Sequence, residues 1–295
     1  MPHVYSHNYK VGEKGAWLGV ATNVLLFGVK LAAGIVGRSQ AMIADAFHTA
    51  SDAVTSIAVL VGFKIASKPA DTHHPYGHGR AESIAAKLVS IVLIAVGFRI
   101  AYDSAHILIQ HEMHEPGIIA LLVAILSIAV KEMTFRKVIR MGSEINSSSL
   151  KADAYHHRSD AFSSVAALIG IAGARMGYRF MDPLAGIIVA GFIIKVGVDV
   201  FHQAYDELMD AAPPDELKLK ISRIVSDVPG VREVKKIMVR KAGIDFFYEI
   251  TIGIDSDISV MKGHGITVAI RRKIFSEMPE VKDVIVHAEP CGVTD

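Results

Sequence analysis

Six long apolar stretches limit the folds that this chain of 295 residues can adopt. A helix needs about 20 mostly apolar residues to cross a bilayer. Apolar residues make up 51% of the sequence, and the mean hydropathy is +0.38. We therefore expect an α-helical membrane protein with six transmembrane helices. The predicted crossings are residues 15–36, 41–66, 82–109, 117–138, 148–175 and 182–203.

Two similar ten-residue sequences, identical at seven positions, occur in the second and the fifth of these stretches. Residues 44–53 read ADAFHTASDA, and residues 152–161 read ADAYHHRSDA. Each copy places a His and an Asp four residues apart, which on a helix puts both side chains on one face. Two such helices would offer two nitrogen and two oxygen donors, a set that suits a tetrahedral divalent metal, above all zinc. The predicted ligands are His48, Asp52, His156 and Asp160.

The repeat is inverted, because the second and fifth of six crossings run in opposite directions. Inverted repeats in transporters commonly place the substrate site where the two halves meet. The alternative is that His48 and His156 are buried helix residues bonded to neighbouring carbonyl groups. A carboxylate inside a membrane costs at least ~2.5–3.5 kcal/mol unless it has a partner or a function. Asp52 and Asp160 therefore favour the metal site.

Other charged side chains also occur inside the predicted crossings. Those spaced four residues apart are expected to form ion pairs within one helix. Lys30 and Lys131 are expected to reach toward the cytoplasmic interface. The predicted intrahelical pairs are Arg99 with Asp103 and Lys195 with Asp199.

The distribution of basic residues predicts the orientation of the chain, because Lys and Arg are enriched in cytoplasmic loops. More of them fall on the side that holds both termini, whereas the opposite side includes the acidic stretch 110–115. We expect a multi-pass protein of the cell (inner) membrane with both termini in the cytoplasm. The net charge of +1 gives no reason to expect a nucleic-acid partner. The single cysteine, Cys291, is compatible with a reducing cytosol.

A second group of possible metal ligands follows the second crossing, in residues 69–80. Asp71, His74 and His78 are close enough in sequence to bind one ion, with His73 as a spare or bridging donor. The alternative is a solvated, His-rich turn. We favour a metal site because Pro and Gly keep the loop short and several donors fall close together.

The sequence changes character after about residue 212, where charged residues alternate with apolar ones as in a small soluble domain. We therefore expect two domains, residues 1–212 and 213–295. The second is predicted to be an α+β unit, punctuated by Pro and Gly. Its predicted elements are a helix over 215–228, strands over 231–241 and 244–255, a helix over 259–278 and a strand over 281–289.

These features together resemble the cation diffusion facilitators, a family of proton-coupled exporters of divalent metals. The resemblance covers nearly the whole chain. It implies that the repeated His-x-x-x-Asp positions form the transport site and that Asp71, His74 and His78 form a loop site. It rests on the twin His-x-x-x-Asp helices, the stretch from Pro69 to Glu82, Asp182-Pro183, Leu208-Met209-Asp210 and His287-Ala288-Glu289-Pro290.

The resemblance also implies a role for the C-terminal domain. In the family this domain is metallochaperone-like, with a ferredoxin-like fold, and pairs across a homodimer. The implied ligands of a regulatory metal here are His264, His287 and Glu289. The sequence departs from the fullest family pattern, because Lys235 and Thr251 stand where some members place further His ligands. Finally, Arg80 and Asp210 match the family's charged lock between the helices and this domain.

We expect a homodimeric antiporter, not an enzyme, that moves Zn²⁺ out of the cytosol in exchange for protons. Metals bind only deprotonated ligands, and histidine titrates near pH ~6.5, so metal and proton would compete for one site. One alternative is a carrier of Fe²⁺, Mn²⁺ or Co²⁺ from the same family. Another is a membrane-tethered zinc-dependent hydrolase, which would need three protein ligands, an open water position and a general base.

Overall fold

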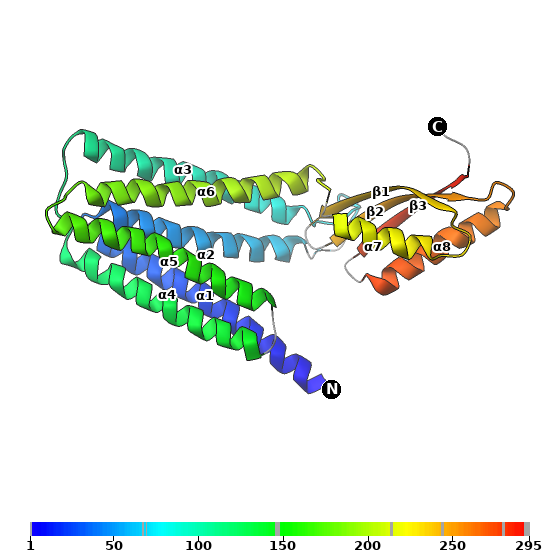
Figure 1. Ribbon diagram of the computed structural model, residues 1–295, viewed down its shortest axis with the longest axis horizontal. Coiled ribbons are helices and arrows are strands. Elements are labelled where there is room, and N and C mark those ends of the chain that lie inside the picture. The colour runs from blue at the N-terminus through cyan, green and yellow to red at the C-terminus, as the bar shows by residue number, and fades with distance from the viewer. Residues whose placement is uncertain are drawn as a thin grey trace. The chain divides into compact units, whose positions relative to one another are not determined.

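The computed structural model contains six long helices, followed in sequence by a small α+β unit (Figure 1). The structure describes residues 2–66, 68, 70–144, 148–212, 215–242, 245–278 and 281–291. Side chains are described in these ranges except at 2–16, 55–64, 66, 142, 144, 148–153, 156 and 157. The long helices are α1 (Pro2–Val36), α2 (Gln40–Ala66), α3 (Ala81–Ile109), α4 (Ile118–Glu144), α5 (Ser148–Arg175) and α6 (Met181–Leu208).

The predicted fold class is confirmed, because each of the six predicted crossings coincides with one of these helices. The largest difference is at α1, which begins well before residue 15. Within the described residues, four stretches are long and apolar enough to cross a membrane: Trp17–Val36, Ala81–Ile109, Ile118–Met141 and Met181–Leu208. The other two long helices, α2 and α5, carry the polar repeated sequence and run in opposite directions (Figure 1).

The N-terminal part of α2 belongs to two buried cores, which together include residues of all five other long helices. Its first turn joins a core of small and apolar residues from α1, α4, α5 and α6, which includes Ala33, Ala124 and Ile171. One turn further on, Ala44 joins a second core with residues of α3 and α6. This packing surrounds the N-terminal half of α2 with protein and shields its polar side chains from lipid.

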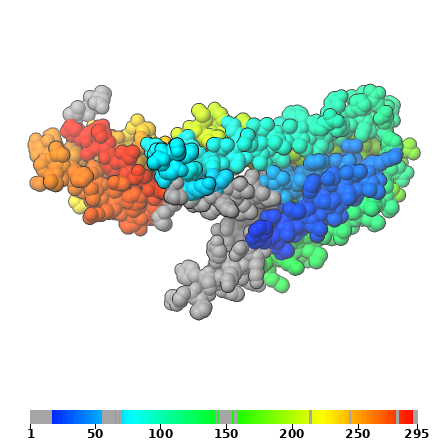
Figure 2. Space-filling model, turned by 180° about the vertical axis from the view of Figure 1, so that it is seen from behind, coloured from blue at the N-terminus to red at the C-terminus, as the bar shows by residue number. Residues whose placement is uncertain are grey.

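The outer surface of the helical unit carries the opposite kind of side chain. Large apolar residues of α1 are exposed, among them Leu25 and Val36, on a helix that lies along the face shown in Figure 2. Exposed apolar residues of the same size occur on α3 and α4, including Phe98 and Leu122. An apolar exterior around a core with polar groups is expected of a bundle that is solvated by lipid.

A buried carboxylate connects the N-terminal ends of α2 and α6. Asp182 accepts hydrogen bonds from the Ser39 hydroxyl at 2.6 Å and from the Gln40 backbone N–H at 2.7 Å. The Ser39 hydroxyl in turn accepts a hydrogen bond from the Met42 N–H, as an N-cap residue does. The sequence pair Asp182-Pro183 therefore fixes where α2 begins relative to α6, and with it the position of the repeated motif.

The C-terminal elements form a three-stranded sheet with two helices on one face (Figure 1). The strand order is β1-β2-β3, with β2 antiparallel to β1 and parallel to β3. Residues of both helices, including Ile221 and Ile270, pack on alternate residues of the strands, including Ile250 and Val284. The elements are α7 (Asp215–Ser226), β1 (Glu233–Ala242), β2 (Asp245–Ile254), α8 (Val260–Glu277) and β3 (Val281–Pro290), which confirms the predicted α+β unit.

By its internal contacts, the chain divides into two compact units. The first comprises residues 1–59 and 88–201, and the second comprises residues 60–87 and 202–295. The loop between α2 and α3 therefore groups with the α+β elements. The domain boundary predicted at residue 212 stays a prediction.

Candidate metal sites

Three of the four predicted ligands of the membrane site lie together inside the helical unit. His48 and Asp52 lie one turn apart on α2, and Asp160 comes from α5. One ligand atom from each lies within 4.8 Å of the other two. The side chains are buried, with only 5%, 9% and 6% of their surfaces exposed. This spacing allows a single divalent ion to contact all three.

The fourth predicted ligand, His156, lies outside the residues whose side chains are described. Its backbone belongs to α5, one turn before Asp160, as the repeat predicts. Among the described residues, the Nδ1 atom of His48 is buried and has no hydrogen-bond partner. An imidazole nitrogen in this condition is a possible metal ligand.

The prediction that Lys30 and Lys131 reach the cytoplasmic interface is wrong. Lys30 is completely buried, and its ammonium lies 2.7 Å from an Asp45 carboxylate oxygen. Lys131 is 2% exposed, and its ammonium donates to the backbone carbonyl of Asp160 at 3.3 Å. Both lysines therefore lie beside the candidate membrane site. The partners of both lysines lie on other helices, far away in sequence. The spacing of charged residues along one helix therefore could not predict these partners.

The two predicted intrahelical ion pairs are present. Arg99 bonds Asp103 at 2.9 Å, and Lys195 bonds Asp199 at 3.1 Å. All four side chains are substantially exposed on the outer surface of the helical unit. They therefore differ from the lysines beside the candidate membrane site, which are buried and bond to other helices.

The loop cluster also comes together as predicted. One ligand atom each from Asp71, His74 and His78 lies within 4.8 Å of the other two. The Asp71 carboxylate accepts hydrogen bonds from the backbone N–H groups of His74 at 2.7 Å and His73 at 2.9 Å. The side chain of His73 does not join the group among the described residues. Compared with the membrane site this cluster is open, because about half of the Asp71 side chain is exposed.

The charge of Asp71 is stabilised by its own loop. The N–H of His74 makes the largest contribution to lowering the pKa of Asp71 below its usual value of 3.8, followed by the N–H of His73 and the nearby imidazoles. Hydrogen bonds to the charged form have this effect on a carboxyl group. Asp71 is therefore an anionic ligand throughout the physiological pH range.

The loop that carries this cluster is attached to the sheet of the same unit. The Arg240 guanidinium of β1 stacks on the Tyr76 ring at 4.9 Å and on the Phe247 ring at 5.2 Å. Gly79 approaches the end of β1 so closely that a Cβ atom there would lie 2.5 Å from the Ala242 carbonyl oxygen. The second residue after α6, Asp210, forms an ion pair with Arg80. The pairing of Arg80 with Asp210 agrees with the family resemblance.

The three predicted ligands of the cytoplasmic domain do not come together within one chain. Among the described residues they form no group of three ligand atoms. His287 and Glu289 lie two residues apart on β3, with 3.4 Å between the His287 Nε2 and a Glu289 oxygen. His264 is an exposed residue of α8, which packs on the face of the sheet that holds Val284. Alternate residues of a strand point to opposite faces, so His287 and Glu289 face away from α8.

Glu289 already has a cationic partner. The Lys235 ammonium lies 2.8 Å from the second Glu289 oxygen. This hydrogen-bonded ion pair lowers the pKa of Glu289 and raises the pKa of Lys235. Lys235 therefore occupies the place beside Glu289 that a metal would need.

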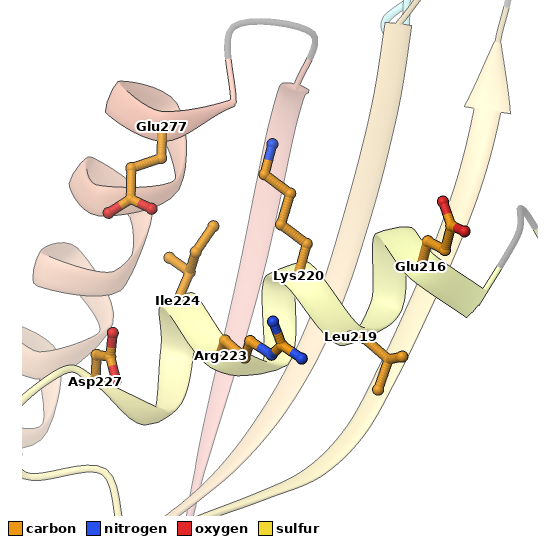
Figure 3. A pocket seen from close by; sticks show the side chains of 7 residues that line it. All are labelled: Glu216, Leu219, Lys220, Arg223, Ile224, Asp227 and Glu277. Atoms are coloured by element: carbon orange, nitrogen blue, oxygen red, sulfur yellow. The ribbon is translucent and has the colours of Figure 1, made fainter.

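A hollow between α7 and α8 does not suit a metal. Its volume is about 410 Å³, and Figure 3 shows that both acidic and basic side chains line it. One of its acidic groups, Asp227, pairs with Lys273 at 3.4 Å. The residues that line the hollow include no His or Cys, and they are Glu216, Leu219, Lys220, Arg223, Ile224, Asp227 and Glu277.

Comparison with known proteins identifies the family. The cation efflux transmembrane domain matches residues 16–209, and the cytoplasmic domain of cation efflux proteins matches residues 213–291. The chain belongs to the cation diffusion facilitator family. As a member of this family of metal cation transporters, it is a multi-pass membrane protein that exports divalent metal cations.

Relatives of this cation diffusion facilitator occur in plants, archaea and bacteria. Metal tolerance protein C1 of Arabidopsis thaliana is 36% identical over 295 residues, which cover 95% of this chain and 63% of the relative. An uncharacterized transporter of Methanocaldococcus jannaschii is 37% identical, covering 94% of this chain and 98% of the relative. Manganese efflux system protein MneP of Bacillus subtilis is 32% identical, and the match covers 97% of this chain and 98% of the relative.

Proposed function

We propose that this protein exports Zn²⁺ from the cytosol in exchange for protons and that the exchange takes place at His48, Asp52, His156 and Asp160. The observation that carries the proposal is the buried group of ligand atoms from α2 and α5, all within 4.8 Å of one another. The two helices come from the two halves of an inverted repeat, and transport sites commonly lie between such halves.

The donor types favour zinc over the other divalent cations. Zinc accepts a tetrahedral mixture of imidazole and carboxylate ligands, whereas manganese prefers oxygen donors. Manganese is the second candidate, because a relative that is 32% identical along nearly its whole length is named for manganese efflux. Iron and cobalt are further candidates within the family. A hydrolase is not favoured, since the family is one of transporters.

Proton coupling follows from the same ligands. Imidazole nitrogens and carboxylates bind metal only when deprotonated. A proton that binds at the site therefore promotes release of the metal, and a metal that binds displaces protons. Alternating exposure of the site to the two sides of the membrane would convert this competition into antiport.

The remaining candidate sites have supporting roles. Asp71, His74 and His78 form an open cluster of ligands next to the α+β elements, and we propose that they bind a second zinc ion at the cytoplasmic surface. The match to the cytoplasmic domain of cation efflux proteins supports a homodimer with both termini in the cytoplasm. His264 lies on one side of the domain, and His287 and Glu289 lie on the other. A regulatory metal that uses all three types of ligand would therefore need ligands from both subunits of the homodimer.

Flux measurements in proteoliposomes test the proposal. The purified full-length protein is reconstituted with a zinc-sensitive dye inside the vesicles, and an acidic interior is imposed. We expect Zn²⁺ uptake that increases with the pH gradient, loses this increase when a protonophore is added, and is lost in Asp52→Ala. Uptake that does not depend on the gradient would contradict antiport, and faster uptake of Mn²⁺ than of Zn²⁺ would support the manganese alternative.

A further inference from the structure

A buried lysine on α1 connects both of the helices that carry the repeated motif. The Lys30 ammonium lies 2.7 Å from Asp45 Oδ2 and donates to Thr49 Oγ1 and Ser164 Oγ, each at 2.9 Å. Asp45 and Thr49 belong to α2, whereas Ser164 belongs to α5. A lysine ammonium has three N–H donors, and these three oxygens can use all of them.

The same carboxylate also joins α2 to α5 directly. Asp45 Oδ1 accepts hydrogen bonds from the hydroxyl groups of Ser163 and Ser164, each at 3.0 Å. The Ser163 hydroxyl also lies 2.7 Å from the backbone carbonyl oxygen of Asp160, so its single hydrogen is shared between the two acceptors. Lys30, Asp45, Ser163 and Ser164 thus form one network in which each side chain is at most 2% exposed.

This network lies one helical turn from the candidate ligands on both helices. Asp45 precedes His48 by three residues, and Ser163 and Ser164 follow Asp160 by three and four residues. One turn of an α-helix advances by about 5.4 Å. The distance between α2 and α5 at the network therefore determines how far Asp160 lies from His48 and Asp52.

A purely structural connection would not require these residues. A buried ion pair is costly to desolvate, and apolar side chains of similar volume often stabilise a protein equally well or better. An ion pair has one property that apolar packing lacks, because its hydrogen bonds have fixed directions. Its net charge is zero, as is that of apolar side chains, so the substitution of both residues leaves the net charge near the metal site unchanged.

We propose that Lys30 and Asp45 are positioning residues that set the separation of α2 and α5 and thereby the coordination geometry and selectivity of the metal site. This inference rests on the proposed role of His48, Asp52 and Asp160 as ligands of the transported ion. Groups that orient metal ligands from behind typically change metal affinity or activity by about 10–100-fold when they are removed.

The test replaces the pair by apolar residues of similar size, Lys30→Met with Asp45→Leu, so that no unpaired charge is buried. The matched control is Lys195→Met with Asp199→Leu, which removes an ion pair that lies on one helix and is 74% and 63% exposed. The full-length proteins are loaded with Co²⁺, whose visible absorption is much stronger in tetrahedral than in octahedral coordination. The spectrum of Asp52→Asn is subtracted, so that only the membrane site contributes.

We expect the Lys30→Met, Asp45→Leu protein to show an altered Co²⁺ spectrum and a ratio of Zn²⁺ to Mn²⁺ flux that falls by about tenfold. The control should match the wild type in both. An unchanged spectrum and an unchanged flux ratio in the folded protein would overturn the inference. If instead the wild type has no Co²⁺ signal that depends on Asp52, the proposed metal site itself is wrong.

A milder variant decides the question if the double variant does not fold. Ser163→Ala with Ser164→Ala keeps the Lys30–Asp45 ion pair but removes the hydroxyl groups through which Asp45 holds α5. We expect the Co²⁺ spectrum to change in the same direction by a smaller amount. A spectrum identical to that of the wild type would overturn the inference.

Discussion

Arg80, the residue before α3, forms an ion pair with Asp210, the second residue after α6, across 130 positions of sequence. Asp210 has a positive φ of 55°, a conformation that Asp and Asn tolerate better than most residues. The pair therefore connects the start of α3 with the end of α6, where the chain leaves α6 for the α+β elements.

Removal of this charge pair should affect transport more than stability. Both side chains are 42% exposed, and an exposed ion pair typically stabilises a protein by less than about 1 kcal/mol. We expect Asp210→Asn, which preserves the backbone conformation, to reduce zinc flux or weaken the dimer while metal binding at the membrane site persists. Transport rate, dimer dissociation and melting temperature are measured beside the control Asp199→Asn. If all three match the wild type, Arg80 and Asp210 are only solvated charges.

The membrane site should depend on each carboxylate. Asp52→Ala and Asp160→Ala each remove an anionic ligand from a buried set of three. Loss of a group that merely orients a ligand costs about 10–100-fold, so we expect loss of the ligand itself to reduce zinc flux to below about one tenth of the wild-type rate. Size-exclusion chromatography should still show a folded dimer. A variant that keeps more than half of the wild-type flux would remove that residue from the site.

Selectivity should depend on the imidazole of His48. The substitution His48→Asp makes the donor set richer in oxygen, which manganese prefers to nitrogen. It also replaces an imidazole, a side chain whose ordinary pKa is about 6.5, by a carboxylate whose ordinary pKa is about 3.9. We expect the ratio of zinc to manganese flux to fall and the pH dependence of transport to move to lower pH. If neither the metal ratio nor the pH profile changes, His48 is not a ligand.

The ion pair between Lys235 and Glu289 should weaken metal binding to the cytoplasmic domain. The ammonium lies 2.8 Å from the carboxylate, so a metal that binds Glu289 must displace it. We expect Lys235→Met to raise the zinc affinity of this domain and Lys235→Met with Glu289→Gln to abolish the gain. Isothermal titration of full-length protein that also carries Asp52→Asn and Asp71→Asn measures this affinity. Equal affinities with and without Lys235 would show that the lysine does not compete.

An acid-sensitive ion pair should stabilise the end of the sheet where β1 begins and β2 ends. Arg232 bonds both oxygens of Asp255 at 2.8 Å, and these bonds lower the pKa of Asp255 below its usual 3.8. The pair therefore contributes stability above the unfolded-state pKa and loses it as the pH falls through the lower folded-state pKa. We expect Asp255→Asn to melt at a lower temperature than wild type at pH 7, with a difference that shrinks as the pH falls below the unfolded-state pKa of Asp255 and through its lower folded-state pKa. A difference that is independent of pH would exclude the carboxylate charge as its cause.

The sequence alone was sufficient to predict the long helices, the α+β elements and two groups of three candidate ligands, His48 with Asp52 and Asp160, and Asp71 with His74 and His78. Apolar runs and alternating patterns are local properties of the chain. The helices and strands lie where these patterns predicted them. The repeated His-x-x-x-Asp pattern could be read in the same way, because a spacing of four residues places both side chains on one helical face. Two equivalent copies then indicated that Asp160 would lie near His48 and Asp52.

Contacts between residues distant in sequence depended on the tertiary structure. Lys30 was expected at the membrane interface, yet it is buried against Asp45 and Ser164 because three helices meet there. The pairing of Lys235 with Glu289 and the separation of His264 from His287 depend on strand order and on which face of the sheet α8 covers. No local pattern encodes these partners, since each arises only when separate elements pack together.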